Sequence, residues 1–241
     1  MRHILVPLDG SSGGQTALKK ANEIAIEHDA VLHIVKRHEM QEVGVRNADA
    51  TFLDLVDSYT LEAERSYLDC LSVLPEREGR IERAIIDGPT FFAYDTYVRD
   101  NLIELVVLPA GSRTADTLMR TLSVMTLVVP RMVEHPPRQR AGTAHVLCAV
   151  GPTGSVRKLS AAAASLRPRM SWQYVECRAT PVSDSTRVDP ATNILSQCRQ
   201  CDAELIVIAS HWRPHRIRGG VSGVCRAVVR EAEVPVLIVP A

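Results

Sequence analysis

Cationic and small side chains are concentrated in one segment near the C-terminal end of the chain, residues 209–223. Its basic members are His211, Arg213, His215, Arg216 and Arg218. The small residues around them are Ala209, Gly219, Gly220, Ser222 and Gly223. Guanidinium groups form charge-assisted hydrogen bonds with phosphate or sulfate, and glycines let backbone N–H groups approach such an anion. The segment therefore predicts a small-anion site. A solvated or interface loop rich in arginine is the other interpretation.

Cys198 and Cys201, followed by His211 and His215, have the residue types of a zinc site. Residues 204–209 between the two pairs indicate a strand, which at about 3.3 Å per residue would hold thiols and imidazoles roughly 20 Å apart. Zinc ligands converge on one ion at about 2.3 Å, so no metal site is expected. The cysteine pair also closes a helix, where no dipole lowers a thiol pKa, so no redox role is expected.

No residue is assigned a catalytic role. Ser210 and His211 place a hydroxyl beside an imidazole, but sequence neighbours at a strand end point apart, and no orienting carboxylate is evident. Residues 12–16 are similar to the pyrophosphate-binding loop of amidating and thiolating enzymes, but Gln15 stands where that loop needs Asp. They are interpreted as a helix start rich in small residues. The remaining histidines, including His33, are expected at the edge of the core or on the surface.

The elements that must position these residues follow one order twice. In the first half, apolar patterns predict strands at 4–8, 30–35, 84–86, 102–108 and 125–129, and helices at 17–25, 52–67, 91–99 and 115–122. In the second half, they predict strands at 145–150, 171–177, 187–188, 204–209 and 234–240, and helices at 156–166, from 190 onward and at 220–232. This alternation favours α/β domains, each with an open parallel sheet of about five strands.

The expected domains are residues 1–130 and 144–241, with the Pro-rich, charged segment 131–143 as a linker. The second domain is abbreviated, because residues 180–186 are too few for a second helix. Asp189 and Pro190 are predicted to start its next helix, as the cap and the first helical residue.

Composition excludes several classes of protein. Hydrophobic residues make up 46% and charged residues 23% of the 241 residues, which argues against a disordered, collagen-like or coiled-coil chain. Aromatics, at 4%, are too few for the stacking surfaces of a single-strand nucleic-acid binder, so no nucleic-acid partner is expected. No apolar run reaches the roughly 18 residues of a membrane span, and six scattered cysteines suit reduced thiols. We expect a cytoplasmic protein with no membrane partner.

The formal net charge of zero is the sum of two unlike halves. Residues 1–130 carry 13 basic and 20 acidic side chains, a net of −7, whereas residues 143–241 carry 12 and 7, a net of +5. This asymmetry predicts either two bodies that attract one another or a basic half that meets an anion.

The ends of both halves resemble a known family. Residues 4–11, Ile-Leu-Val-Pro-Leu-Asp-Gly-Ser, are similar to the opening of a universal stress protein, and residues 232–240 to its closing strand. Residues 127–130 are similar to the same closing strand in a first copy. The resemblance implies two tandem domains of the Rossmann-like, adenine nucleotide alpha hydrolase-like class. In members that bind nucleotides it implies an Asp after the first strand. It also implies a loop after the fourth strand, with two glycines three apart, nine residues, then Gly and Ser or Thr.

Neither half has that pattern complete. The first half has Asp9, but its fourth strand is expected to lead straight into a helix without the glycine loop. The second half has a loop of the right length, but Gly151 replaces the Asp, Ala209 and Trp212 replace two glycines, and Ser222-Gly223 inverts the final pair. An indole at position 212 would occupy phosphate volume unless it swings out.

Two functional hypotheses follow. The first is a stress-associated protein without enzymatic activity or cofactor that acts through protein or small-anion contacts. The second is a sensor that binds ATP or another adenine nucleotide through the altered loop of the second half. An adenylating or nucleotide-hydrolysing enzyme is the weakest alternative, because no general base can be named. Since fifth strands pair across the dimer of single-copy members, the two halves are expected to pair theirs as an internal pseudo-dimer. A further homodimer and a protein partner are left open.

Overall fold

The computed structural model describes residues 1–8, 12–37, 65, 72, 74, 80–130, 144–150, 155–166, 172–178, 189–210 and 223–240. Its strands are β1 (His3–Leu8), β2 (Val31–Arg37), β3 (Ile81–Ile86), β4 (Leu105–Pro109), β5 (Met125–Val129), β6 (Ala144–Val150), β7 (Trp172–Arg178), β8 (Leu205–Ser210) and β9 (Val236–Pro240). Its helices are α1 (Ser12–His28), α3 (Thr90–Asp100), α4 (Arg113–Thr121), α5 (Val156–Leu166), α6 (Pro190–Gln200) and α7 (Gly223–Glu231). The predicted strand 187–188 and linker 131–143 lie outside these ranges, as does the predicted helix 52–67 except for Arg65.

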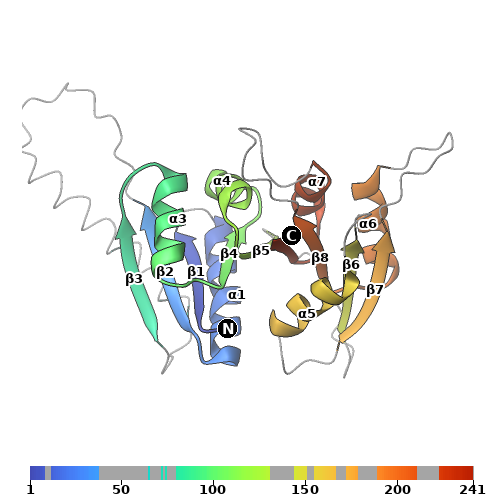
Figure 1. Cartoon of the computed structure of the whole chain (residues 1–241), viewed down its shortest axis with the longest axis horizontal. Helices are drawn as coiled ribbons and strands as arrows, with labels where there is room; N and C mark the ends of the chain where they lie inside the picture. Colours follow the sequence, from blue (N-terminus) through green and yellow to red (C-terminus); the bar gives the residue numbers. More distant parts are fainter. Residues whose placement is uncertain are drawn as a thin grey trace, which may run out of the picture.

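The described strands form one sheet in the order β3-β2-β1-β4-β5-β9-β8-β6-β7, with helices on both faces (Figure 1). Within each half all pairs are parallel, which confirms the predicted α/β class. Strands covered on both faces need apolar residues at every position, and all five residues of β4 are buried. The predicted start of α6 is also confirmed, because the Asp189 carboxylate accepts a hydrogen bond from the Thr192 amide at 3.4 Å. Within the described ranges, no helix has the length and apolarity to cross a membrane.

The two halves meet at the pair β5 and β9, the one antiparallel pair among the described strands. Thr126 lies opposite Ile238, Leu127 opposite Leu237, and Val128 opposite Val236. Leu127 and Leu237 are fully buried, each with 0% exposure. The sheet therefore continues from one half to the other through strands whose central residues are buried.

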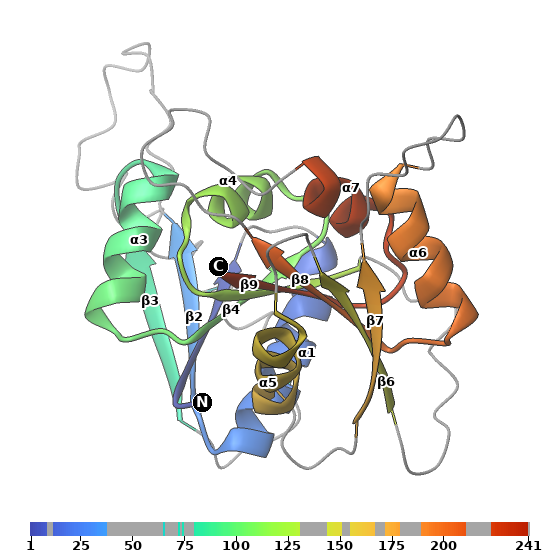
Figure 2. The same cartoon turned by 45° about the vertical axis from the view of Figure 1, so that its right-hand side comes forward.

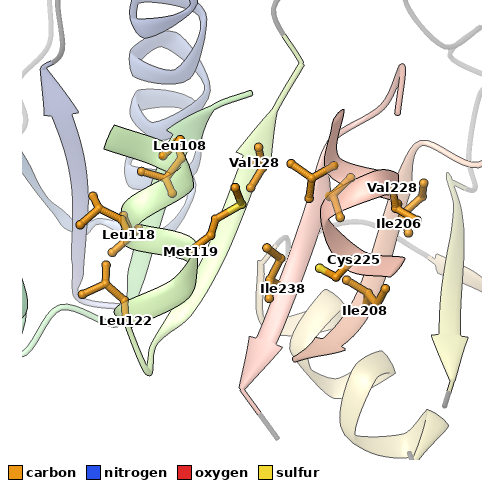
Figure 3. Packing of buried hydrophobic residues seen from close by; sticks show 14 of the residues in the cluster. Leu108, Leu118, Met119, Leu122, Val128, Ile206, Ile208, Cys225, Val228 and Ile238 are labelled. Atoms are coloured by element: carbon orange, nitrogen blue, oxygen red, sulfur yellow. The ribbon is translucent and has the colours of Figure 1, made fainter. Parts of the chain in front are cut away.

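Two apolar cores, one on each face of the sheet, run through both halves. Leu127 and Leu237 belong to the core covered by α1 and α5, and Val128 and Val236 to the core covered by α3, α4, α6 and α7. Figure 2 shows α4 and α7 on either side of the junction. Figure 3 shows Met119 of α4 pointing toward Val128 of β5, and Cys225 of α7 pointing toward Ile238 of β9. Alternation along a strand thus divides the residues of the junction between the two cores.

Polar contacts add little to this joint among the described residues. Each ion pair between described residues joins two residues of the same half: Lys20 with Glu23, His33 with Glu82 and Arg99 with Asp95 in the first, and Arg199 with Glu233 and Arg230 with Glu231 in the second. Beside the backbone bonds of the β5–β9 pair, one side-chain hydrogen bond between described residues crosses between the halves, from His28 Nε2 to the Leu166 carbonyl at 2.9 Å. In this part of the chain the joint is apolar and backbone-based, and the opposite charges of the halves do not meet in ion pairs.

The halves are structural repeats. Ile4 pairs with Leu105 as Val146 pairs with Leu205, so β6 and β8 match β1 and β4. The Glu104 amide donates to the His3 carbonyl at 3.0 Å, and the Glu204 amide to the His145 carbonyl at 2.9 Å. Strands β7 and β9 match β2 and β5, whereas β3 has no counterpart among the described strands. About five strands were predicted for the second half, and four are described.

The helices before β4 and β8 end in the same turn. The Ile103 amide donates to the Val98 carbonyl and the Ala203 amide to the Cys198 carbonyl, each at 3.0 Å, the long bond of a Schellman motif. This motif needs one left-handed residue, which is Leu102 at φ 51° and Asp202 at φ 49°. The predicted strand 102–108 is therefore wrong at its start, because Leu102 ends the helix and β4 begins at Leu105.

Leu102→Gly should stabilise the protein by roughly 0.5–1 kcal/mol. A left-handed non-glycine residue costs about 1–2 kcal/mol, and the entropy lost by glycine offsets part of that gain. The Leu102 side chain is 75% exposed, so little packing is lost. Urea unfolding measures the change. The matched control is Asp202→Gly, which should gain less because Asp tolerates this conformation; an equal or larger gain there would contradict the explanation.

Candidate functional site

Ligands of open α/β sheets bind beyond the carboxyl ends of the strands, so each half offers one such place. In the first half β1 and β4 end at Leu8 and Pro109, and in the second β6 and β8 end at Val150 and Ser210. The helices that follow β4 and β8, α4 and α7, lie at the same end of the molecule in both views (Figures 1 and 2). The two places differ in the length of the segment that joins the strand to the following helix.

In the first half the chain passes from β4 to α4 through three residues, Ala110 to Ser112. The Ala110 amide donates to the Val129 carbonyl at 2.8 Å, and Gly111 turns the chain with φ 74°. Ser112, 7% exposed, caps α4 by accepting a hydrogen bond from the Ala115 amide at 3.0 Å. This confirms that β4 leads directly into a helix. The hydroxyl of Ser112 thus already binds one of the free amides at the start of α4.

In the second half twelve residues, 211–222, separate β8 from α7. The structure places the two ends of this segment. Ala209 pairs with Val239 in the sheet, and Gly223 is the first residue of α7, with no atom within 4 Å of the place where a Cβ would stand. The other predicted site residues lie outside the described residues: Asp9, His211, Arg213, Arg216, Arg218, Gly219, Gly220 and Ser222.

Comparison with known proteins adds the family. The model of the universal stress protein family matches residues 1–130 and 177–240, which is more than half of the chain. The chain belongs to the universal stress protein family. Its two matched segments agree with a tandem arrangement of two stress-protein domains. No curated protein matches the chain.

Solved structures agree on the fold along the whole length of this universal stress protein. A universal stress protein from Archaeoglobus fulgidus DSM 4304 has 11% identity and a TM-score of 0.62, over 99% of this chain and 98% of the other. A functionally unknown protein from Pseudomonas aeruginosa PAO1 has 15% identity and a TM-score of 0.59, over 100% and 92%. At such identities the likeness concerns the fold alone.

Three described cysteines in the second half of this universal stress protein, Cys198, Cys201 and Cys225, are held as thiols. Burial raises the pKa of Cys198 to about 12 and that of Cys225 to about 12, and it also raises the pKa of Cys201. The Cys201 thiol donates to the Cys198 carbonyl at 3.7 Å. The cysteine pair precedes β8, whereas the segment 211–222 follows it, so a strand about 20 Å long separates them. Among the described residues, no group of three or more His, Cys, Asp or Glu side chains could hold a metal ion.

His33 is buried, so the surface alternative is wrong for this residue. His33 is 1% exposed in the middle of β2, and its ring bonds to His3 and Tyr97. The signal was available in the sequence, because His33 lies within the apolar run 30–35 of a parallel strand, and such strands are buried on both faces.

At pH 8, iodoacetamide should leave Cys198 and Cys225 unmodified in the folded protein. With a pKa of about 12, only about one thiol in 10⁴ is ionised at that pH, and the thiolate is the reacting form. Peptide mass mapping after timed alkylation measures the modification, and the same protein in urea is the control, in which both sites should react fully. Rapid modification of either cysteine in the folded protein would contradict its burial.

Proposed function

We propose that this universal stress protein is a stress-associated binding protein without enzymatic activity, and that it receives a small anion at the segment 211–222 of its second half. The observation that carries the proposal is the difference between the two halves. Three residues join β4 to α4, and one of them, Ser112, caps the start of the helix. Twelve residues join β8 to α7. The second half therefore has the chain length for a ligand loop, and the first does not.

The charges favour the second half in the same way. The segment 211–222 contains three arginines and two histidines and no acidic residue. The first turn of α7 also lacks an acidic residue, whereas the first turn of α4 contains Asp116. Amides at a helix N-terminus and the helix dipole favour an anion there, and a carboxylate in the first turn opposes a second negative group.

The thiol beside the proposed loop offers no nucleophile for a covalent reaction. Cys225 lies within α7, next to the proposed loop, and burial keeps its pKa at about 12. A thiol held in this state is not an activated nucleophile. We infer that ligand binding, with no chemical step, is the activity.

Gly223 favours an adenine nucleotide as the second candidate ligand. The space around the missing Cβ is open, so a phosphate could approach the backbone at the start of α7. Ala209, at the end of β8, also has a small side chain at the entrance to the loop. Both small residues suit a ligand longer than a single anion.

A thermal-shift titration with phosphate tests the proposal. A ligand that binds only the folded protein at 100 times its Kd stabilises it by about 2.7 kcal/mol, so the melting temperature should rise and saturate. Chloride at the same ionic strength is the salt control. Arg216→Ala and Arg218→Ala should abolish the rise, and the matched control Arg157→Ala, an exposed arginine on α5, should keep it. An equal rise in all variants would refute the assignment, and release of inorganic phosphate from ATP would refute the lack of enzymatic activity.

Gly223→Ala separates ligand approach from folding. Because the Cβ enters open space, the variant should be at least as stable as the wild type, with a gain of a few tenths of a kcal/mol from helix propensity. It should weaken saturation by ATP with Mg²⁺ at least tenfold if phosphate contacts this backbone. Unchanged affinity for ATP would exclude the second candidate at this position while leaving phosphate binding by the arginines to be judged separately.

A further inference from the structure

The first half contains a buried polar chain that links its sheet to α3. His3 Nδ1 lies 3.0 Å from His33 Nε2, and His33 Nδ1 lies 3.0 Å from the Tyr97 hydroxyl of α3. Glu82 Oε2, on β3, lies 3.4 Å from the same His33 Nδ1. His33 is 1% exposed, whereas the Glu82 side chain is 57% exposed. Side chains from β1, β3 and α3 thus meet at the imidazole of His33 on β2.

The partners of His33 fix where its proton resides. A carboxylate only accepts hydrogen bonds, so Glu82 favours a proton on His33 Nδ1, which is shared with the Tyr97 oxygen. His33 Nε2 then has a lone pair and accepts from the Nδ1–H of His3. Both rings are neutral in this arrangement, and every bond has one donor and one acceptor.

A further proton on His33 does not fit this arrangement. On Nε2 it would point at the His3 Nδ1–H donor across 3.0 Å. Burial lowers the pKa of His33, Glu82 opposes this by raising it, and His3 lowers it further. Among the described residues, the groups that face His33 are His3 from β1, Glu82 from β3 and Tyr97 from α3.

We propose that the His3–His33 pair is an acid-sensitive latch, which holds α3 on the sheet while His33 is neutral and releases α3 when His33 binds a further proton. Because Tyr97 of α3 contacts the ring of His33, which is 1% exposed, undocking this helix would bring water to a charged His33. The Tyr94 hydroxyl, which donates to the Val35 carbonyl at 3.4 Å, is the neighbouring polar contact that α3 would lose. Because α3 begins directly after the carboxyl end of β3, release would loosen the helix beside the ligand edge of the first half.

The sign of the effect follows from proton linkage. With α3 released, His33 titrates near its ordinary pKa of 6.5, and with α3 docked it titrates lower. Above pH 6.5 neither form binds the proton, so docking does not depend on it. As the pH falls below 6.5 the released form gains protons that the docked form lacks, and its population rises by up to about tenfold per pH unit.

Amide hydrogen exchange in α3 tests the latch. After correction for the intrinsic pH dependence of exchange, opening of Thr90–Asp100 should increase roughly tenfold between pH 7.5 and pH 5.0. Helix α6 of the second half is the internal control, since His145, the counterpart of His3, donates to the Cys201 carbonyl at 2.6 Å and has no imidazole partner among the described residues. An increase in α6 equal to that in α3, or no increase in α3, would overturn the proposal.

Two variants make the test specific. His33→Gln keeps a donor and an acceptor but cannot titrate, so the increase in α3 should vanish, whereas His145→Gln should keep it. Glu82→Gln, at an exposed side chain, removes the group that raises the pKa of docked His33, so that pKa falls further below that of the released form and the increase in α3 opening at pH 5.0 should become larger. This variant tests the latch if His33→Gln does not fold. An unchanged or smaller increase in Glu82→Gln, or loss of the increase in His145→Gln, would refute the latch.

Discussion

The antiparallel pairing of β5 with β9 is the constraint on which the rest of this structure depends. Each half alone would end in an apolar strand with unpaired backbone groups, a liability at the edge of a sheet. Pairing satisfies those groups and fixes the register, with Leu127 opposite Leu237. Since a shift of one residue would turn every side chain to the other face, this register also decides which residues enter which core. The two cores can run through both halves only in this arrangement.

Sharing one sheet leaves the carboxyl ends of the two halves free to differ. In the first half the turn after β4 is short and capped by Ser112, and the polar chain around His33 fastens α3. In the second half no counterpart of β3 is described, and a longer basic segment follows β8. The acidic first half and the basic second half therefore share one sheet but differ at the carboxyl ends of their strands. In the described part of the chain, apolar contacts hold the two halves together.

Much of this fold could be predicted from sequence, because a buried parallel strand needs an uninterrupted apolar run and such runs are visible at β1, β4, β6 and β8. The start of α6 was equally readable, since Asp189 and Pro190 have side chains suited to a cap and a first turn. An apolar side chain at position 102 favours a strand in the sequence pattern. The left-handed conformation of Leu102 is set instead by the turn that the hydrogen bond from the Ile103 amide closes. The burial of His33 follows from its place in the apolar run 30–35, but its partners could not be predicted, because they come from β1, β3 and α3, which no local pattern brings together. Of the predicted site residues, the structure positions Ala209 and Gly223, where strand and helix periodicity apply; the segment between them has no such periodicity.

The most direct test of the shared sheet is a double-mutant cycle across the junction, with Leu127→Ala, Leu237→Ala and the double variant compared by urea unfolding. Each single change should cost about 2–5 kcal/mol, because both leucines are fully buried. Since the two side chains lie opposite one another, the effects should be non-additive by about 0.5 kcal/mol or more. Additive effects, within about 0.3 kcal/mol, would contradict the account, because they would mean that the halves do not meet at this pair.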